Sequence, residues 1–96
     1  MDATPKTLYM VIEHFKNKDA VGVYRRFRDR GRMAPAGLLY VSSWVDVKLE
    51  RCYQLMETHD AKLVDEWIAN WNDLVDFEVH RVITSQEAAD RIAPRL

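Results

Sequence analysis

Hydrophobic and polar positions recur along the chain with two different periods, and each period predicts a type of element. Apolar side chains fall at every second position in four stretches rich in β-branched and aromatic residues, which is typical of β-strands. In two longer stretches they fall three and four residues apart, which is typical of amphipathic helices. We therefore expect strands at 7–15, 38–45, 51–58 and 76–83, and helices from 20 to about 32–34 and at 61–75.

Short polar residues mark where helices are expected to begin. Asn17 or Asp19 precedes the first helix and Asp60 the second, and such side chains accept hydrogen bonds from the free backbone N–H groups of a first turn. The sequence Thr-Ser-Gln-Glu at 84–87 matches a capping box. It predicts a third, short helix that ends near Ile92.

The order of these elements predicts an α+β fold. Strand, helix, strand, strand, helix and strand form the ferredoxin-like βαββαβ sandwich, with an antiparallel sheet in the order 4-1-3-2, both main helices on one face and a trailing C-terminal helix. With 96 residues, the chain is expected to form one domain, 1–96, with its core at about 7–93. The second face of such a sheet is left uncovered, and an exposed apolar face is an association site.

Strand alternation sorts the side chains onto the two faces of the expected sheet. We expect the more aliphatic set to pack under the helices: Met10, Ile12, Val41, Val45, Gln54, Met56, Phe77, Val79 and Ile83. We expect the set that mixes aromatic with ionisable groups on the open face: Tyr9, Val11, Glu13, Tyr40, Ser42, Trp44, Arg51, Tyr53, Leu55, Glu57, Glu78, His80 and Val82.

The open face contains the candidate chemistry. If strands 4 and 1 are neighbours, Glu13 and Glu78 lie close together, and two such carboxyls push one pKa up and leave one group as acid and the other as base. His80, two residues from Glu78, is a candidate proton carrier near neutral pH. Glu13, Glu78 and His80 are thus the candidate catalytic residues.

Four further residues of the open face are candidates for ligand binding: Tyr9, Trp44, Arg51 and Tyr53. In the alternative interpretation, Glu13 or Glu78 is paired with Arg51, or with an arginine of a second subunit, in a structural polar network.

Charge and histidine spacing narrow the choice of partners. Fourteen basic against fifteen acidic residues give a net charge of −1, so no global field recruits nucleic acid or an anionic membrane. The three histidines are not spaced as a chelate, and adjacent Glu13 and His14 point to opposite faces of a strand, so we expect no metal site. No motif implies a cofactor.

Cysteine usage and the start of the chain bear on the compartment. The single Cys52 forms no internal disulfide, which suits a reducing cytoplasm, and its alternating context favours a small buried hydrophobe over a nucleophile. Residues 1–6 have no signal-peptide pattern and are expected to be a frayed start. No apolar stretch reaches the about 18 residues that span a bilayer.

Five arginines lie between positions 25 and 32. Most of them are expected on the solvated face of the first helix, and the alternative is an anion site near Gly31-Arg32-Met33, where guanidinium groups converge. Trp67 and Trp71 fall on the apolar stripe of the second helix, which favours a place in the core over a ligand platform.

Several stretches together resemble a known family. YMVIEHFK, YRRFRDRGRMAPAGLLYVSSWV, RCYQLME, DEWIANWNDLVDFEV and the TSQEA after strand 4 are similar to the family named domain of unknown function 3303, over about 8–89. The resemblance implies a dimeric α+β barrel, in which two sheets pair through their open faces, and no established activity. Proteins of that larger type include small monooxygenases, heme enzymes and muconolactone isomerases, and fold alone does not choose among them.

We therefore expect a cytoplasmic homodimer that binds a small molecule over the open sheet face, with acid/base chemistry at Glu13, Glu78 and His80. The alternative is a non-catalytic interaction or regulatory module whose open face serves only dimerisation.

Overall fold

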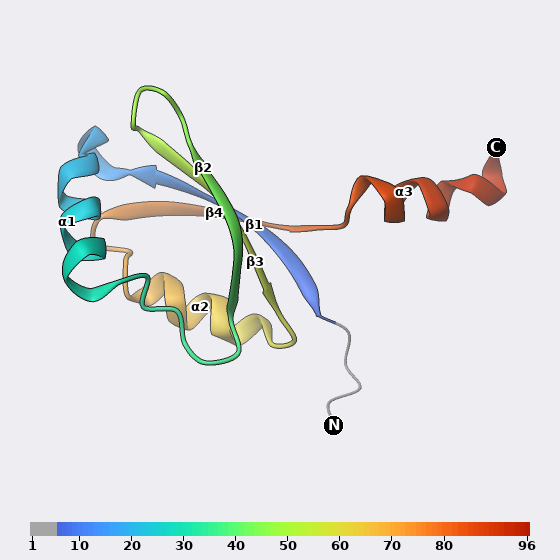
Figure 1. The fold of residues 1–96 in the computed structure, drawn as a ribbon, viewed down its shortest axis with the longest axis horizontal. Coiled ribbons are helices and arrows are strands. Elements are labelled where there is room, and N and C mark those ends of the chain that lie inside the picture. The colour runs from blue at the N-terminus through green and yellow to red at the C-terminus, as the bar shows by residue number, and fades with distance from the viewer. Residues whose placement is uncertain (1–5) are drawn as a thin grey trace.

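A computed structural model describes residues 6–96 of the chain. The first five residues, part of the expected frayed start, lie outside the described residues. The elements in chain order are β1 (Thr7–Phe15), the 3-10 turn η1 (Lys16–Lys18), α1 (Ala20–Arg30), β2 (Leu39–Val45), β3 (Arg51–Thr58), α2 (Ala61–Ala69), β4 (Val75–Val82), α3 (Ser85–Ile92) and the 3-10 turn η2 (Ala93–Arg95) (Figure 1).

The sheet confirms the ferredoxin-like prediction. Its strands run in the order β2-β3-β1-β4, and every neighbouring pair is antiparallel. α1 and α2 pack on one face of this sheet, while α3 projects beyond the end of β4, away from the rest of the chain (Figure 1).

Side-chain caps begin each of the three α-helices in residues 6–96. Asp19, Asp60 and Thr84 accept hydrogen bonds from the backbone N–H of Gly22, Lys62 and Glu87, at 3.2, 3.0 and 3.1 Å respectively. Each cap satisfies a donor that has no partner within its helix.

Both main helices end earlier than their apolar patterns predict. α1 ends at Arg30 because Gly31 takes a φ of 70° and donates its N–H to the carbonyl of Phe27 at 2.7 Å. α2 ends at Ala69, and the chain turns through 70–74 into β4. Trp71 lies in this turn rather than in the helix. It is still buried, so it belongs to the core, as its place on the apolar stripe predicts.

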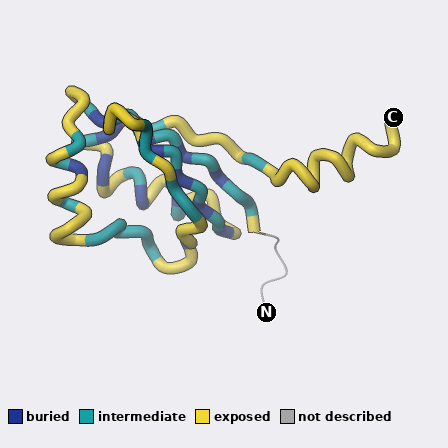
Figure 2. Tube along the Cα trace, turned by 45° about the horizontal axis from the view of Figure 1, so that its top comes forward, coloured by how far each residue is buried: buried dark blue, intermediate teal, exposed yellow. Residues whose placement is uncertain are grey.

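The core lies between the helix-covered face of the sheet and the two main helices (Figure 2). Its least exposed members are Val11, Met56, Val75 and Trp67, and the ring of Trp67 meets that of Phe77 edge-on at 6.1 Å. α3 is exposed along its whole length (Figure 2). Among the described residues, no helix is long and apolar enough to cross a membrane.

The faces of β1 are the reverse of those expected. Tyr9, Val11 and Glu13 are buried under the helices, whereas Met10 and Ile12 lie on the open face. Both sets of β1 side chains are largely apolar, so the sequence distinguishes the two faces mainly by the charge of Glu13. A charge favours the open face, whereas the structure buries this carboxyl under the helices.

Tyr40 is also on the other face from the one expected. A register shift between Tyr40 and Ser42 places Tyr40 opposite Met56, on the helix side, and leaves Val41 exposed at the irregularity. Beyond it, Trp44 pairs with Tyr53 on the open face, as expected.

Candidate functional site

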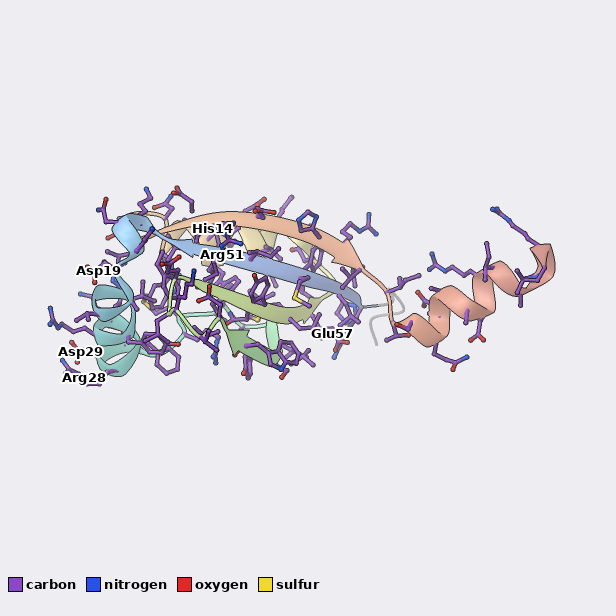
Figure 3. The ribbon with its side chains drawn as sticks, turned by 90° about the horizontal axis from the view of Figure 1, so that it is seen from above. His14, Asp19, Arg28, Asp29, Arg51 and Glu57 are labelled. Carbon is purple, nitrogen blue, oxygen red and sulfur yellow. The ribbon has the colours of Figure 1, made fainter. Side chains whose placement is uncertain are left out.

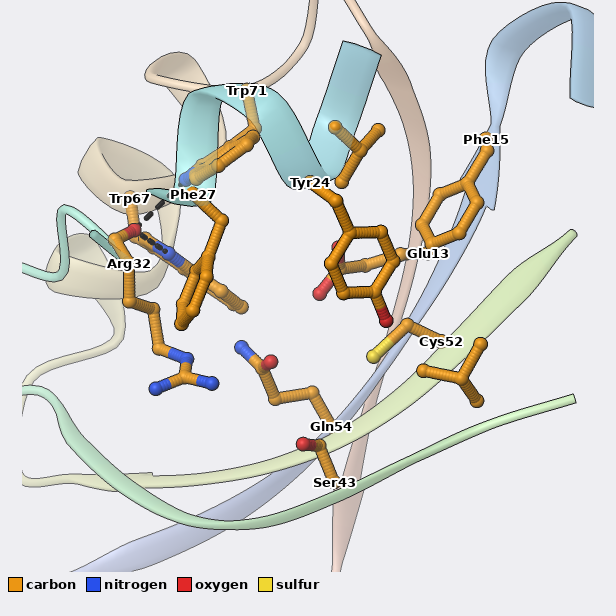
Figure 4. Close-up of a pocket in the computed structure, with 12 residues that line it drawn as sticks. Glu13, Phe15, Tyr24, Phe27, Arg32, Ser43, Cys52, Gln54, Trp67 and Trp71 are labelled. Atoms are coloured by element: carbon orange, nitrogen blue, oxygen red, sulfur yellow. Dashed lines mark hydrogen bonds between the residues drawn. The ribbon is translucent and has the colours of Figure 1, made fainter. Parts of the chain in front are cut away.

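A half-enclosed pocket of about 220 Å³ lies between the sheet and the two main helices (Figure 4). Its walls are mostly aromatic and aliphatic, with a few polar groups, a composition typical of small-molecule sites. The lining residues are Glu13, Phe15, Val23, Tyr24, Phe27, Arg32, Ser43, Val45, Cys52, Gln54, Trp67 and Trp71. We call this cavity the Glu13 pocket.

Exposure separates the floor of the Glu13 pocket from its rim. Glu13, Cys52 and Gln54 are buried and form the floor. Tyr24 and Phe27, on α1, are 47% and 42% exposed, and with the half-buried Arg32 they form the rim. The opening therefore lies along α1 and the segment that follows it.

Glu13 is the most unusual group of the floor. It is 7% exposed, its carboxyl points into the pocket (Figure 4), and it has no hydrogen bond or ion pair with any other residue in 6–96. Burial raises the pKa of Glu13 from 4.5 to about 7, and the positive charge of Arg32 opposes part of that rise. At neutral pH the carboxyl is thus divided between its acid and its base form.

Two other titratable groups share this environment. Burial and then the negative charge of Glu13 raise the pKa of Cys52 to about 12, so the thiol stays neutral, as expected for a buried hydrophobe. Burial, with smaller contributions from Cys52 and Glu13, also raises the pKa of Tyr24. The phenol is therefore a hydrogen-bonding group of the rim rather than a charged one.

Most of the other predicted site residues lie on the open face of the sheet. Glu78 lies between two histidines, with its Oε1 2.6 Å from Nε2 of His14 and its Oε2 3.3 Å from Nε2 of His80. These hydrogen bonds lower the pKa of Glu78. Arg51 is the cross-strand neighbour of His14, and the two lie together at one end of the sheet (Figure 3).

The prediction that Glu13 and Glu78 share a face is wrong. In the β1–β4 register Glu78 opposes Ile12, and Glu13 opposes Phe77, so the two carboxyls point to opposite sides of the sheet. Tyr9 is likewise on the helix side, as a buried core residue opposite Met56. The open face brings together Glu78, His80, Arg51, Tyr53 and Trp44, without Glu13 and without Tyr9.

Sequence reasoning missed most of the Glu13 pocket. Gln54 offered one signal, because it is a polar side chain in an otherwise apolar set that was correctly placed under the helices. Arg32 offered a second signal, as part of the anion site considered near Gly31-Arg32-Met33. Tyr24 and Phe27 offered none, since their places depend on how α1 lies over the sheet.

Comparison with known proteins agrees with the fold. A model of the family described as a domain of unknown function (DUF3303) matches residues 7–96. The crystal structure of PA3566 from Pseudomonas aeruginosa is similar to 86% of this chain and 98% of its own, with a TM-score of 0.55 and 13% sequence identity. That likeness concerns the fold alone. A search of curated proteins finds no match.

Proposed function

The chain belongs to the DUF3303 family, and we propose that the protein binds a compact organic molecule in the Glu13 pocket, with Glu13 as proton donor and acceptor toward it. One observation carries this proposal: a buried carboxyl without a partner among residues 6–96 points into a cavity. Its oxygens are open to solvent through the pocket, since no fully buried side-chain oxygen or nitrogen of the described residues lacks a hydrogen-bond partner. A ligand that enters the pocket can therefore hydrogen-bond this carboxyl directly.

The size and the walls of the pocket support a small, mostly apolar ligand. A dry cavity of roughly 150 Å³ accommodates benzene, so about 220 Å³ suits a single ring with one or two polar substituents. Phe15, Phe27 and Trp67 supply aromatic walls for such a ring. The side chains of Gln54 and Tyr24 add two hydrogen-bonding groups that orient it.

The proton chemistry follows from the environment of Glu13. A group acts best as general acid and base when its pKa lies near the working pH, and burial brings Glu13 to about 7. In this proposal the acid/base group is Glu13 on the helix-covered face, and not the open-face set expected from the sequence. Glu78, on the open face, is hydrogen-bonded to His14 and His80, which are not the arginine partners of the alternative interpretation.

The open face supports the second part of the proposal, a homodimer. Met10, Ile12 and Leu55 lie on it half-exposed, and Trp44 is 55% exposed. The face carries both signs of charge, so a two-fold partner can set Arg51 against Glu57 or Glu78. A protein that dimerises in this way and binds nothing in the Glu13 pocket is the competing non-catalytic module.

Phenol is a suitable probe of the pocket, since it is one ring with one hydroxyl. We expect phenol to shift the NMR signals of the Gln54 side-chain amide and of the Trp67 and Trp71 indoles. Glu13→Gln should weaken phenol binding several-fold, whereas the matched control Glu57→Gln, on the open face, should leave phenol binding unchanged. Shifts confined to the open face, or no binding, would contradict the proposal and favour the non-catalytic module.

A further inference from the structure

Arg32 stands at the rim of the Glu13 pocket without an acidic partner. Its Cζ lies 3.7 Å from the centroid of the Tyr40 ring and 5.2 Å from that of Phe27, and no carboxylate of residues 6–96 lies within ion-pair distance of it. Two neighbouring arginines do have acidic partners. Arg26 binds Asp73 through two hydrogen bonds of 2.7 and 2.6 Å, and Arg28 binds Asp29 at 2.8 Å.

The backbone of Arg32 is held in place from α2 and the turn after it. The indole N–H groups of Trp67 and Trp71 both donate to the Arg32 carbonyl, at 3.0 and 2.9 Å (Figure 4). The side-chain amide of Asn70 donates to the carbonyl of Met33 at 3.0 Å. Three side chains thus fix a two-residue segment.

This segment has an unfavourable backbone conformation. Met33 takes a φ of 59°, in the left-handed region that residues other than glycine rarely adopt. Such strain persists only where surrounding contacts impose it, and it is concentrated at functional sites. Here hydrogen bonds from Trp67, Asn70 and Trp71 hold the backbone, and the side chain of Arg32 extends from it to the rim of the pocket.

We propose that the molecule bound in the Glu13 pocket carries a carboxylate, which pairs with the guanidinium of Arg32 at the rim. This inference rests on the proposed function and adds the class of ligand. The planar guanidinium matches a carboxylate through two parallel hydrogen bonds. The apolar part of the ligand then lies between the aromatic walls, with any hydroxyl or carbonyl directed to Glu13 on the floor.

A carboxylate suits this site better than a phosphate. One unpaired guanidinium balances one negative charge, whereas a phosphate dianion needs further donors. The rest of the rim, Tyr24 and Phe27, offers one hydroxyl and an apolar ring. On the floor, the buried Glu13 carboxyl disfavours a second negative charge.

Benzoate and benzamide test the inference, because they share size and shape and differ in charge. NMR titration of the full chain at pH 6.5 should show both probes shifting the Gln54 and tryptophan side-chain signals. Since charge-assisted hydrogen bonds are about twice as strong as neutral ones, benzoate should bind at least about tenfold more tightly than benzamide. Arg32→Gln should abolish this preference, Arg32→Lys should retain part of it, and the exposed Arg25→Gln should leave it unchanged.

The outcomes separate the two proposals. Equal affinity of the two probes in the parent protein, or a preference that survives Arg32→Gln, overturns the carboxylate inference and leaves the pocket as a binding site. Failure of both probes to shift the Gln54 and tryptophan signals overturns the proposed function and the carboxylate inference with it.

Discussion

Glu13 and Cys52 oppose each other across β1 and β3, so a carboxyl and a thiol point from adjacent strands into the same pocket. Burial raises the pKa of both, to about 7 and about 12. Negative charge on Glu13 contributes to the pKa of Cys52 as well. Near neutral pH the pocket therefore holds a neutral thiol beside a carboxyl that exchanges its proton readily.

Cys52 should be chemically inert in the folded protein. The thiolate is the reactive form, and a pKa of about 12 leaves very little of it at pH 8.5. We expect iodoacetamide to alkylate Cys52 at least about a hundredfold more slowly in the native protein than in urea. Glu13→Gln should change this rate little, because burial is the main cause. Equal rates in native and unfolded protein, followed by mass spectrometry, would contradict the assignment.

Glu13 should make the protein less stable as the pH rises. Its pKa is higher in the folded than in the unfolded state, so the folded protein binds the extra proton between pH 4.5 and about 7, and stability falls across that range. A pKa difference of one corresponds to about 1.4 kcal/mol, so the full loss approaches about 3 kcal/mol above pH 7.

Glu13→Gln removes this titration. Urea unfolding should find the variant close to the parent protein at pH 5 and more stable at pH 8, by up to about 3 kcal/mol. Glu66→Gln, which alters an exposed carboxylate of α2 outside the pocket and the open face, is the charge-matched control. A Glu13→Gln variant that is less stable than the parent at pH 8 would show that the ionised carboxyl has a stabilising partner.

The strand and helix positions could be read from the sequence because local patterns determine them. β1 and β3 begin and end at the predicted residues, and Asp19, Asp60 and Thr84 cap the helices. The facing of β1 could not be read, because Leu8, Met10 and Ile12 are as apolar as Tyr9 and Val11. The irregularity that reverses Tyr40 likewise leaves no mark in the alternation.

The Glu13 pocket could be predicted only in part, since long-range contacts build it. Glu13 drew attention as a charge in an apolar strand, but its assignment to the open face paired it with the wrong carboxyl. The anion site considered near Gly31-Arg32-Met33 rested on arginine density alone. The conformation of that segment depends on Trp67 and Trp71, more than thirty residues away.

Trp67 and Trp71 should act together on the Arg32 segment. Each donates to the same carbonyl oxygen, so a single Trp→Phe variant leaves that oxygen one donor and the double variant leaves it none. We expect each single variant to lose about 1–2 kcal/mol in urea unfolding, and the double variant to lose more than both together. Strictly additive losses would show that the two bonds do not share the carbonyl in solution.

Leu55 tests the proposed dimer. It lies on the open face opposite Met10, where a buried lysine would bring an unpaired charge into a sheet-to-sheet interface. We expect Leu55→Lys to weaken self-association at least about tenfold in sedimentation experiments, with phenol binding retained. The control Val47→Lys, at a fully exposed position of the β2–β3 turn, should have no effect. A parent protein that is monomeric at micromolar concentration would overturn the dimer.

The titration of the Glu13 carboxyl, followed by carbon NMR with and without benzoate, tests the central claim most directly. The account predicts a midpoint near pH 7 in the free protein, and a higher one with benzoate, because a second negative charge in the pocket disfavours ionisation. A midpoint in the ordinary range of a glutamate, unmoved by benzoate, would contradict it.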